Sequence, residues 1–209
     1  MTRRPPRWET ASCTCATATC STPSNDRKMT TWVLFAGLPG TGKSTLARAL
    51  AGRLDAAILD KDRVRAALFP GALIDYSASQ DQVCMRSMLA AAAYLTEHRR
   101  VPFIFFDGRT FSTQAQRDEV LFAAEQAGAE SRILHVSCAD SVAEQRLTAV
   151  DPEHPARNRD PALYYAIKQH FEPIHDPKLE VDTTLGADTV LGLVEAWLGE
   201  EKGGSLTRL

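Results

Sequence analysis

The feature that most constrains this chain is a glycine-rich loop between a strand pattern and a helix pattern. Residues 31–36, with the sequence TWVLFA, form an apolar run of strand character. After the loop come leucines at helical spacing, Leu46, Leu50 and Leu54. The loop itself reads Gly37-Leu38-Pro39-Gly40-Thr41-Gly42-Lys43-Ser44-Thr45. Because strand, loop and helix follow in the order that a Walker A motif requires, we interpret residues 37–45 as a phosphate-binding loop.

The residue types in this loop suit a bound nucleotide. Its glycines let successive N–H groups point into one concavity, and the N-terminus of the next helix adds partial positive charge. We therefore predict that residues 37–45 bind ATP, with Lys43 reaching the β- and γ-phosphates and Ser44 ligating Mg²⁺. A glycine-rich turn without a ligand is the alternative, and it gives no reason for Lys43 and Ser44 at this offset.

Length and composition favour one domain. The 209 residues are enough for a single α/β domain with a full core. A formal net charge of -2 makes nucleic acid an unlikely main partner, and no apolar run approaches the length of a membrane span. Cys84 and Cys138 lie in apolar patterns, so we expect buried free thiols and a reducing, cytoplasmic setting. We expect a monomer or a homodimer.

Both ends of the chain differ from its middle. Residues 1–28 are rich in Thr, Ser, Pro and Arg, and we expect a disordered tail. Met29 comes directly before the first strand, so whether translation starts at Met1 or Met29 stays open. The domain that contains the phosphate-binding loop is expected over residues 29–200, followed by a flexible C-terminus at 201–209.

Strand and helix patterns alternate after the loop, which is typical of a parallel sheet with crossover helices. Residues 56–59, with the sequence AAIL, predict a second strand that leads directly into Asp60, Asp62 and Arg65. Ligands in such sheets bind beyond the carboxyl ends of the strands, which places these three residues near the phosphates. Asp62 is also a candidate N-cap of the following helix.

The most apolar strand, residues 101–106, delivers Asp107. A carboxylate directly after a buried strand is the Walker B arrangement, which holds Mg²⁺ directly or through water. Whether Asp60 or Asp107 ligates the metal stays open. Arg109 follows at the same sheet edge, either as part of a ligand site or as one side of a structural salt bridge.

The later segments contain a candidate lid. Asp140-Ser141 is expected to cap a helix carrying Arg146, and Asp160-Pro161 to begin another. Between these helices, residues 151–160 contain two prolines together with Arg157 and Arg159. We expect this segment to be mobile without nucleotide and ordered over ATP.

Two further patterns complete the element assignment. Ser79-Gln80-Asp81-Gln82 is similar to a capping box that opens a long helix. His135 lies among apolar residues of the fourth strand, so we interpret it as a core or sheet-face histidine.

These motifs together resemble the small P-loop kinases, which include adenylylsulfate kinase, gluconate kinase, chloramphenicol phosphotransferase and the kinase domain of phage polynucleotide kinase. The resemblance covers about residues 31–198. It implies a P-loop NTPase three-layer α/β sandwich, with a five-stranded parallel sheet in the order 2-3-1-4-5 and a short lid. Residues 59–65, LDKDRVR, are most similar to adenylylsulfate kinase, which has a Gly where Lys61 stands here.

The resemblance also implies roles for individual residues. Asp62 would lie by the acceptor hydroxyl, and Arg65 would bind the acceptor or a phosphate. Arg146, with Arg157 or Arg159, would match the lid arginines, and which of the last two is the finger stays open. The chain does not match the adenylylsulfate-binding segments, and residues 151–173 do not match that lid, so the acceptor is not identified.

The sequence thus predicts an ATP-dependent kinase that transfers the γ-phosphate to a hydroxyl of a small, anionic metabolite. Asp62 would act as base or orienting group, and Arg65 and Arg109 would clamp the anionic group. One alternative is a kinase for polynucleotide 5′-hydroxyl ends. The other is a nucleotide-binding switch or regulatory ATPase, in which the acceptor-side residues are structural.

Overall fold

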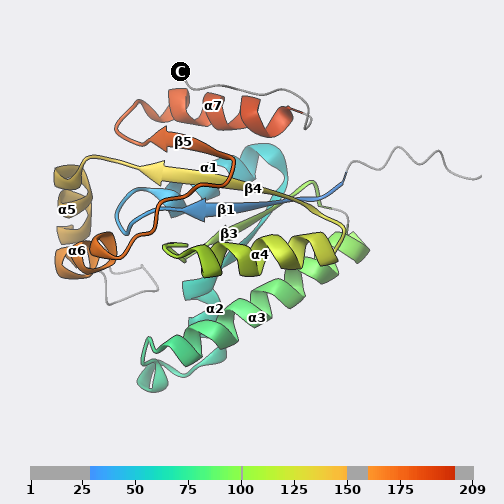
Figure 1. The fold of residues 1–209 in the computed structure, drawn as a ribbon, viewed down its shortest axis with the longest axis horizontal. Helices are drawn as coiled ribbons and strands as arrows, with labels where there is room; N and C mark the ends of the chain where they lie inside the picture. Colours follow the sequence, from blue (N-terminus) through green and yellow to red (C-terminus); the bar gives the residue numbers. More distant parts are fainter. Residues whose placement is uncertain (1–28, 100, 150–159, 201–209) are drawn as a thin grey trace, which may run out of the picture.

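The computed structural model describes residues 29–99, 101–149 and 160–200, and these form one α/β sandwich (Figure 1). Its strands are β1 (Thr31–Ala36), β2 (Ala56–Asp60), β3 (Phe103–Asp107), β4 (Glu130–Ser137) and β5 (Lys178–Asp182). All neighbouring strands run parallel, in the order β2-β3-β1-β4-β5. The predicted fold class and strand order are therefore confirmed.

Helices connect these strands. They are α1 (Lys43–Leu54), α2 (Lys61–Leu68), α3 (Ala78–Tyr94), α4 (Gln114–Gln126), α5 (Asp140–Thr148), α6 (Pro161–Gln169) and α7 (Ala187–Gly199). A 3₁₀ turn, η1 (Gly71–Leu73), precedes α3, and a π-helical turn, η2 (Leu95–Arg99), extends it. Figure 1 shows α7 above the sheet, with α3 and α4 below it.

The core lies on both faces of the sheet, because its central strands β1 and β3 are buried at every position. Side chains alternate between faces along β1. Val33 and Phe35 pack with α1 and α7, whereas Trp32 and Leu34 pack with α3 and α4. This arrangement fixes β1 and β3 at the centre, so the loops that follow them are held at the middle of one sheet edge.

Three predicted helix caps differ from the structure. Asp60, not Asp62, caps α2, because its carboxylate accepts from the Asp62 and Arg63 N–H groups. Ser77, not Ser79, caps α3. Asp140 is the first residue of α5, and its carboxylate binds Lys168 and the Tyr164 hydroxyl of α6 instead of capping. In each case a neighbouring residue or helix competes for the predicted cap.

The predicted start of α6 is confirmed, because Asp160 caps this helix and Pro161 is its first residue. Thr113 caps α4. His135 is half-buried on β4, where its ring stacks on Phe171 and its Nδ1 lies 3.4 Å from a Glu180 oxygen.

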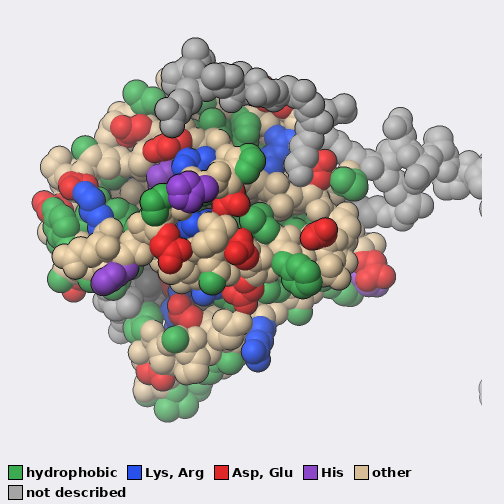
Figure 2. Space-filling model, in the orientation of Figure 1, with side chains coloured by type: hydrophobic (Ala, Val, Ile, Leu, Met, Phe, Trp, Pro, Cys, Tyr) green, Lys and Arg blue, Asp and Glu red, His purple; other side chains and the backbone are tan. Residues whose placement is uncertain are grey.

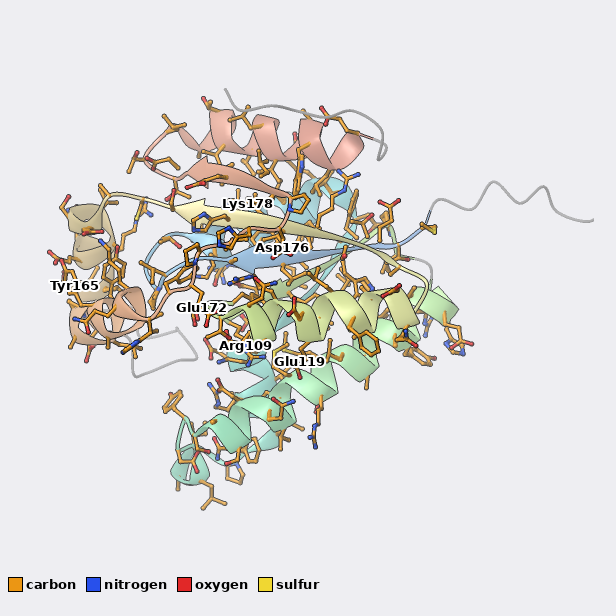
Figure 3. The ribbon with its side chains drawn as sticks, viewed as in Figure 1. Arg109, Glu119, Tyr165, Glu172, Asp176 and Lys178 are labelled. Atoms are coloured by element: carbon orange, nitrogen blue, oxygen red, sulfur yellow. The ribbon has the colours of Figure 1, made fainter. Side chains whose placement is uncertain are left out.

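A fully buried arginine attaches the α6–β5 connection to α4. The Arg117 guanidinium donates to the Phe111 and Pro173 carbonyls, at 2.9 and 3.2 Å, and lies 3.7 Å from Asp176. Glu172, labelled with Asp176 in Figure 3, accepts from the N–H of Gln114 at the start of α4. The α5–α6 pair is thereby held over the loop that follows β3.

Several predictions fall outside the described residues. These are the disordered tail at 1–28, the C-terminus at 201–209, and the lid arginines Arg157 and Arg159. Among the helices that are described, none is long and apolar enough to cross a membrane.

Candidate active site

The glycine-rich loop adopts a conformation that only glycine accommodates easily. Gly37, Gly40 and Gly42 have φ angles of 142°, 79° and 91°. A Cβ atom on Gly37 would lie 2.2 Å from the Val136 carbonyl oxygen of β4. Two constraints, the positive φ and the close approach of another strand, therefore require glycine at the start of this loop.

Hydrogen bonds hold the loop to its neighbours. The Gly37 N–H donates to the Thr110 carbonyl after β3, at 3.0 Å. The Thr41 hydroxyl donates to the Leu38 carbonyl at 2.8 Å, and the Thr183 hydroxyl, after β5, donates to the Thr41 carbonyl at 2.8 Å. The loop shape is thus set by β3 and β5 as well as by its own residues.

Lys43 reaches back over the loop. It is buried, and its Nζ donates to the Gly37 and Leu38 carbonyls, at 2.8 and 2.6 Å. This places the ammonium group inside the concavity of the loop. The predicted role of Lys43 as a phosphate ligand is compatible with this position.

Next to the loop lies a cavity of about 340 Å³. Its phosphate end is lined by the loop residues Pro39, Gly40, Gly42, Lys43, Ser44 and Thr45. Gly37, Leu38 and Thr41 do not line it and instead fix the loop conformation. Its other end is formed by α2, the start of α3, the segment after β3, and two residues of α6, Leu163 and Ile167.

Asp107 ends β3 beneath the loop with 1% of its surface exposed. Burial raises the pKa of its carboxyl; a hydrogen bond with Ser44 lowers it, and the neighbouring Asp60 charge raises it further. Its Oδ1 has no hydrogen-bond partner among the described residues. An unpartnered buried carboxylate oxygen beside a hydroxyl suits Mg²⁺, which takes few protein ligands and completes its shell with phosphate and water oxygens.

Asp60 is engaged differently. Its Oδ1 caps α2, its Oδ2 lies 3.7 Å from the Arg63 Nε, and a Cβ on Gly108 would lie 2.8 Å from Oδ1. The described residues contain no group of three or more His, Cys, Asp or Glu side chains suited to hold a metal. These contacts favour Asp107 over Asp60 as the carboxylate that would hold a metal ion.

A cluster of four charged side chains lies on α2 and α3, and we call it the acceptor-side cluster after the role predicted for Asp62: Lys61, Asp62, Arg65 and Asp81. Arg65 is 3% exposed, and its Nη1 donates to Asp62 Oδ1 at 3.1 Å while its Nη2 donates to Asp81 Oδ1. Lys61 Nζ donates to Asp81 Oδ2 at 3.0 Å. The Tyr76 ring centroid lies 5.0 Å from the Arg65 guanidinium carbon. Helices α2 and α3 are therefore joined by a network of opposite charges that faces the cavity.

Arg109 lines the same end of the cavity and pairs with α4. Its Nη1 lies 3.2 Å from Glu119 Oε2, and the two labelled side chains meet in Figure 3. The other Glu119 oxygen accepts from Gln82 Nε2 of α3, at 2.7 Å. Of the two readings left open for Arg109, the salt bridge is present, and the ligand-binding role stays a prediction.

Arg146 lies against the phosphate loop from the α5 side. Its Nη1 donates to the Thr183 hydroxyl at 2.9 Å and to the Gly40 carbonyl at 3.3 Å. Arg146 is not among the residues that line the cavity, so its role toward ATP stays a prediction, and Arg157 and Arg159 lie outside the described residues.

Sequence reasoning missed several residues of the site. Lys61 and Asp81 form half of the acceptor-side cluster, yet Asp81 fitted a capping box and Lys61 carried no motif. Arg48 lines the cavity one helical turn after Ser44, a spacing that could have revealed it. The role of Thr183 depends on the pairing of β5 with β4, which no local pattern specifies.

Comparison with known families assigns the domain. The family model described as AAA domain, AAA_33, matches residues 33–173. The chain belongs to this AAA-domain family. A comparison with curated proteins found no match.

Three solved structures share the fold of this AAA-domain protein. The Mycobacterium tuberculosis APS kinase CysC, in complex with AMPPNP and APS, is 18% identical with a TM-score of 0.62, over 82% of this chain and 99% of that one. A gluconokinase from Sinorhizobium meliloti 1021 is 16% identical, with a TM-score of 0.57 over 82% and 93%. Chaetomium thermophilum Kti12, in complex with ADP-AlF3, is 15% identical, with a TM-score of 0.57 over 81% and 100%. The predicted resemblance to small P-loop kinases is confirmed at the level of the fold.

Proposed function

We propose that this protein is an ATP-dependent kinase that transfers the γ-phosphoryl group to a hydroxyl of a small acceptor. The observation that carries the proposal is that one cavity joins the phosphate loop to a separate charged wall containing Asp62. Nucleotide binding alone needs the first part only. A second built wall at the γ-phosphate end provides a place for an acceptor.

The phosphate end supplies positioning and charge neutralisation, which phosphoryl transfer chiefly requires. Lys43 and the loop N–H groups would hold the β- and γ-phosphates. Ser44 and Asp107 would hold Mg²⁺, which neutralises charge that develops on the phosphate oxygens. Arg146, fixed to Gly40 and Thr183, would support the nucleotide from the α5 side.

At the acceptor end, Asp62 would orient the attacking hydroxyl and take its proton as the new O–P bond forms. Arg65 holds the Asp62 carboxylate at 3.1 Å, which limits the positions that the base can adopt. The sequence predicted an anionic acceptor because Arg65 and Arg109 were expected to be available as anion ligands. In the structure, both guanidinium groups pair with carboxylates of the chain itself. We therefore propose an acceptor with a hydroxyl group, but not that this acceptor is anionic.

A regulatory ATPase is the second candidate, since Kti12 in complex with ADP-AlF3 also shares the fold, with a TM-score of 0.57. A polynucleotide kinase has less support. Acidic and basic side chains are interspersed on the face in Figure 2, whereas a strand-binding channel needs a basic groove.

The experiment is to incubate the protein with Mg-ATP and a panel of hydroxyl metabolites, and to measure ADP formation. The kinase proposal expects ADP that appears only with particular acceptors. Uniform slow hydrolysis with every compound would favour the regulatory ATPase. Transfer to a 5′-hydroxyl oligonucleotide that weakens steeply with salt would favour the polynucleotide kinase.

A further inference from the structure

The acceptor end of the cavity has balanced charge. Three of its lining residues are cations, Lys61, Arg65 and Arg109. Each has a carboxylate oxygen of the chain within 3.2 Å: Asp81 for Lys61, Asp62 for Arg65, and Glu119 for Arg109. Three carboxylates therefore pair with these three cations, and Arg48 of α1 is a further cation that lines the cavity.

These pairs are shielded from solvent, so they are screened weakly. The Arg65 side chain is 3% exposed and that of Lys61 is 11% exposed. An anion that drew Arg65 away would take a paired cation from both Asp62 and Asp81, whose side chains are only 15% and 29% exposed, and this is strongly unfavourable. It would also bring a negative charge close to two carboxylates and to the γ-phosphate.

Uncharged hydroxyl groups fit the same wall without this conflict. The carboxylates of Asp62 and Asp81 accept hydrogen bonds from hydroxyls, and the ammonium group of Lys61 can donate to them. The Tyr76 ring, which packs by the Arg65 guanidinium, adds an aromatic surface for the C–H groups of a carbohydrate-like chain.

We propose that the acceptor is an uncharged polyhydroxylated compound, and that Asp81 determines this specificity by neutralising Lys61 and Arg65. The inference depends on the proposed function and names the substrate class of that site. In the transfer, one acceptor hydroxyl loses its proton to Asp62 as its oxygen bonds to the γ-phosphorus. The bond from that phosphorus to the β,γ-bridging oxygen breaks, giving a phosphomonoester and ADP.

The first test compares acceptors that differ only in a terminal CH₂OH or carboxylate. The pairs are glycerol with glycerate, erythritol with erythronate, glucitol with gluconate, and glucose with glucuronate. We expect kcat/KM for the neutral member of the best pair to exceed that of its anionic partner by about tenfold or more. An anionic partner that reacts equally well or better overturns the inference and leaves the kinase proposal standing. No acceptor-dependent turnover with any pair, although Mg-ATP still binds, contradicts the kinase proposal and this inference with it.

The second test changes the charge balance of the cluster. Asp81→Asn leaves Lys61 and Arg65 with one carboxylate fewer, so the ratio of neutral to anionic kcat/KM should fall by about tenfold. Asp118→Asn, the same change on an exposed position of α4, is the control and should leave the ratio unaltered. Equal losses for both members of a pair would show that Asp81 only supports the structure.

A second variant, which changes the charge of the cluster in the opposite direction, keeps the test informative if Asp81→Asn does not fold. Lys61→Met removes a cation and leaves the cluster with an excess carboxylate. The ratio should then rise above that of the wild type, because the anionic partner is repelled further. An unchanged ratio would overturn the role assigned to the Lys61–Asp81 pair.

Discussion

The two ends of the cavity differ in whether backbone or side-chain atoms form them. The phosphate end consists mainly of backbone: glycines with positive φ, loop N–H groups, and carbonyls that hold Lys43. The acceptor end consists of side chains from α2, α3 and the segment after β3, which pair within α2, between α2 and α3, and with Glu119 of α4. The geometry of the acceptor end therefore depends on which side chains pair with one another and not on the backbone conformation.

This difference indicates which end of the cavity a single substitution can alter. The backbone geometry of the phosphate end is set by the central strands β1 and β3. A single substitution therefore alters this end little, unless it replaces Lys43 or a glycine. The acceptor end can be changed by one substitution, because one carboxylate, Asp81, neutralises two cations. Nucleotide handling and acceptor choice should therefore be separable by mutation.

The largest effect is expected at the phosphate end. Lys43→Met removes the cation that would neutralise the γ-phosphate, so kcat should fall by roughly two or more orders of magnitude with every acceptor. ADP formation measured with several acceptors checks this expectation. Lys178→Met, at an exposed position of β5, is the control. If kcat fell for one class of acceptor only, the two ends would not be separable as described.

A smaller but still large effect is expected for the loop backbone. Gly37→Ala places a Cβ 2.2 Å from the Val136 oxygen at a φ of 142°, and should lower the free energy of unfolding by roughly 2–4 kcal/mol. Chemical denaturation measures the difference. Gly52→Ala in α1, where a Cβ meets no atom within 4 Å, should instead raise stability by about 0.5–1 kcal/mol. Equal effects at both glycines would contradict the backbone account of the phosphate end.

The smallest effect concerns a residue of neither end. Burial lowers the pKa of His135 below its ordinary 6.5, although Glu180 opposes the shift. The folded state therefore prefers the neutral ring, and this contribution is fully present above pH 6.5 and is lost as the pH falls through the folded pKa. His135→Gln should reduce the loss of stability on acidification, whereas His98→Gln at an exposed position should not. Denaturation midpoints across this pH range provide the measurement.

The conformation and position of the phosphate loop were predictable from the sequence because the signals for them are local. Glycines at fixed offsets, a lysine and serine at a helix start, and a carboxylate after an apolar strand each carry their meaning within a few residues. The position of Asp107 followed directly from the strand that precedes it. The strand order came with the resemblance to the small P-loop kinases.

The acceptor end was less predictable because its contacts join residues that are far apart in the sequence. Asp81 looked like part of a capping box, yet its carboxylate crosses from α3 to hold Lys61 and Arg65 of α2. Asp62 looked like a helix cap, but Asp60, two residues earlier and the last residue of β2, takes that position. The pairing of carboxylates with cations depends on how α2 packs against α3. No periodic pattern in the sequence predicts this pairing.

The most direct test of the central claim is to measure acceptor phosphorylation and ATP binding in Asp62→Asn. The kinase account predicts that acceptor-dependent ADP formation falls by roughly two or more orders of magnitude, while the Kd for Mg-ATP stays close to that of the wild type. Asp118→Asn should match the wild type in both measurements. Full acceptor phosphorylation by Asp62→Asn, or parallel loss of ATP binding, would contradict the claim that Asp62 serves an acceptor at a separate end of the cavity.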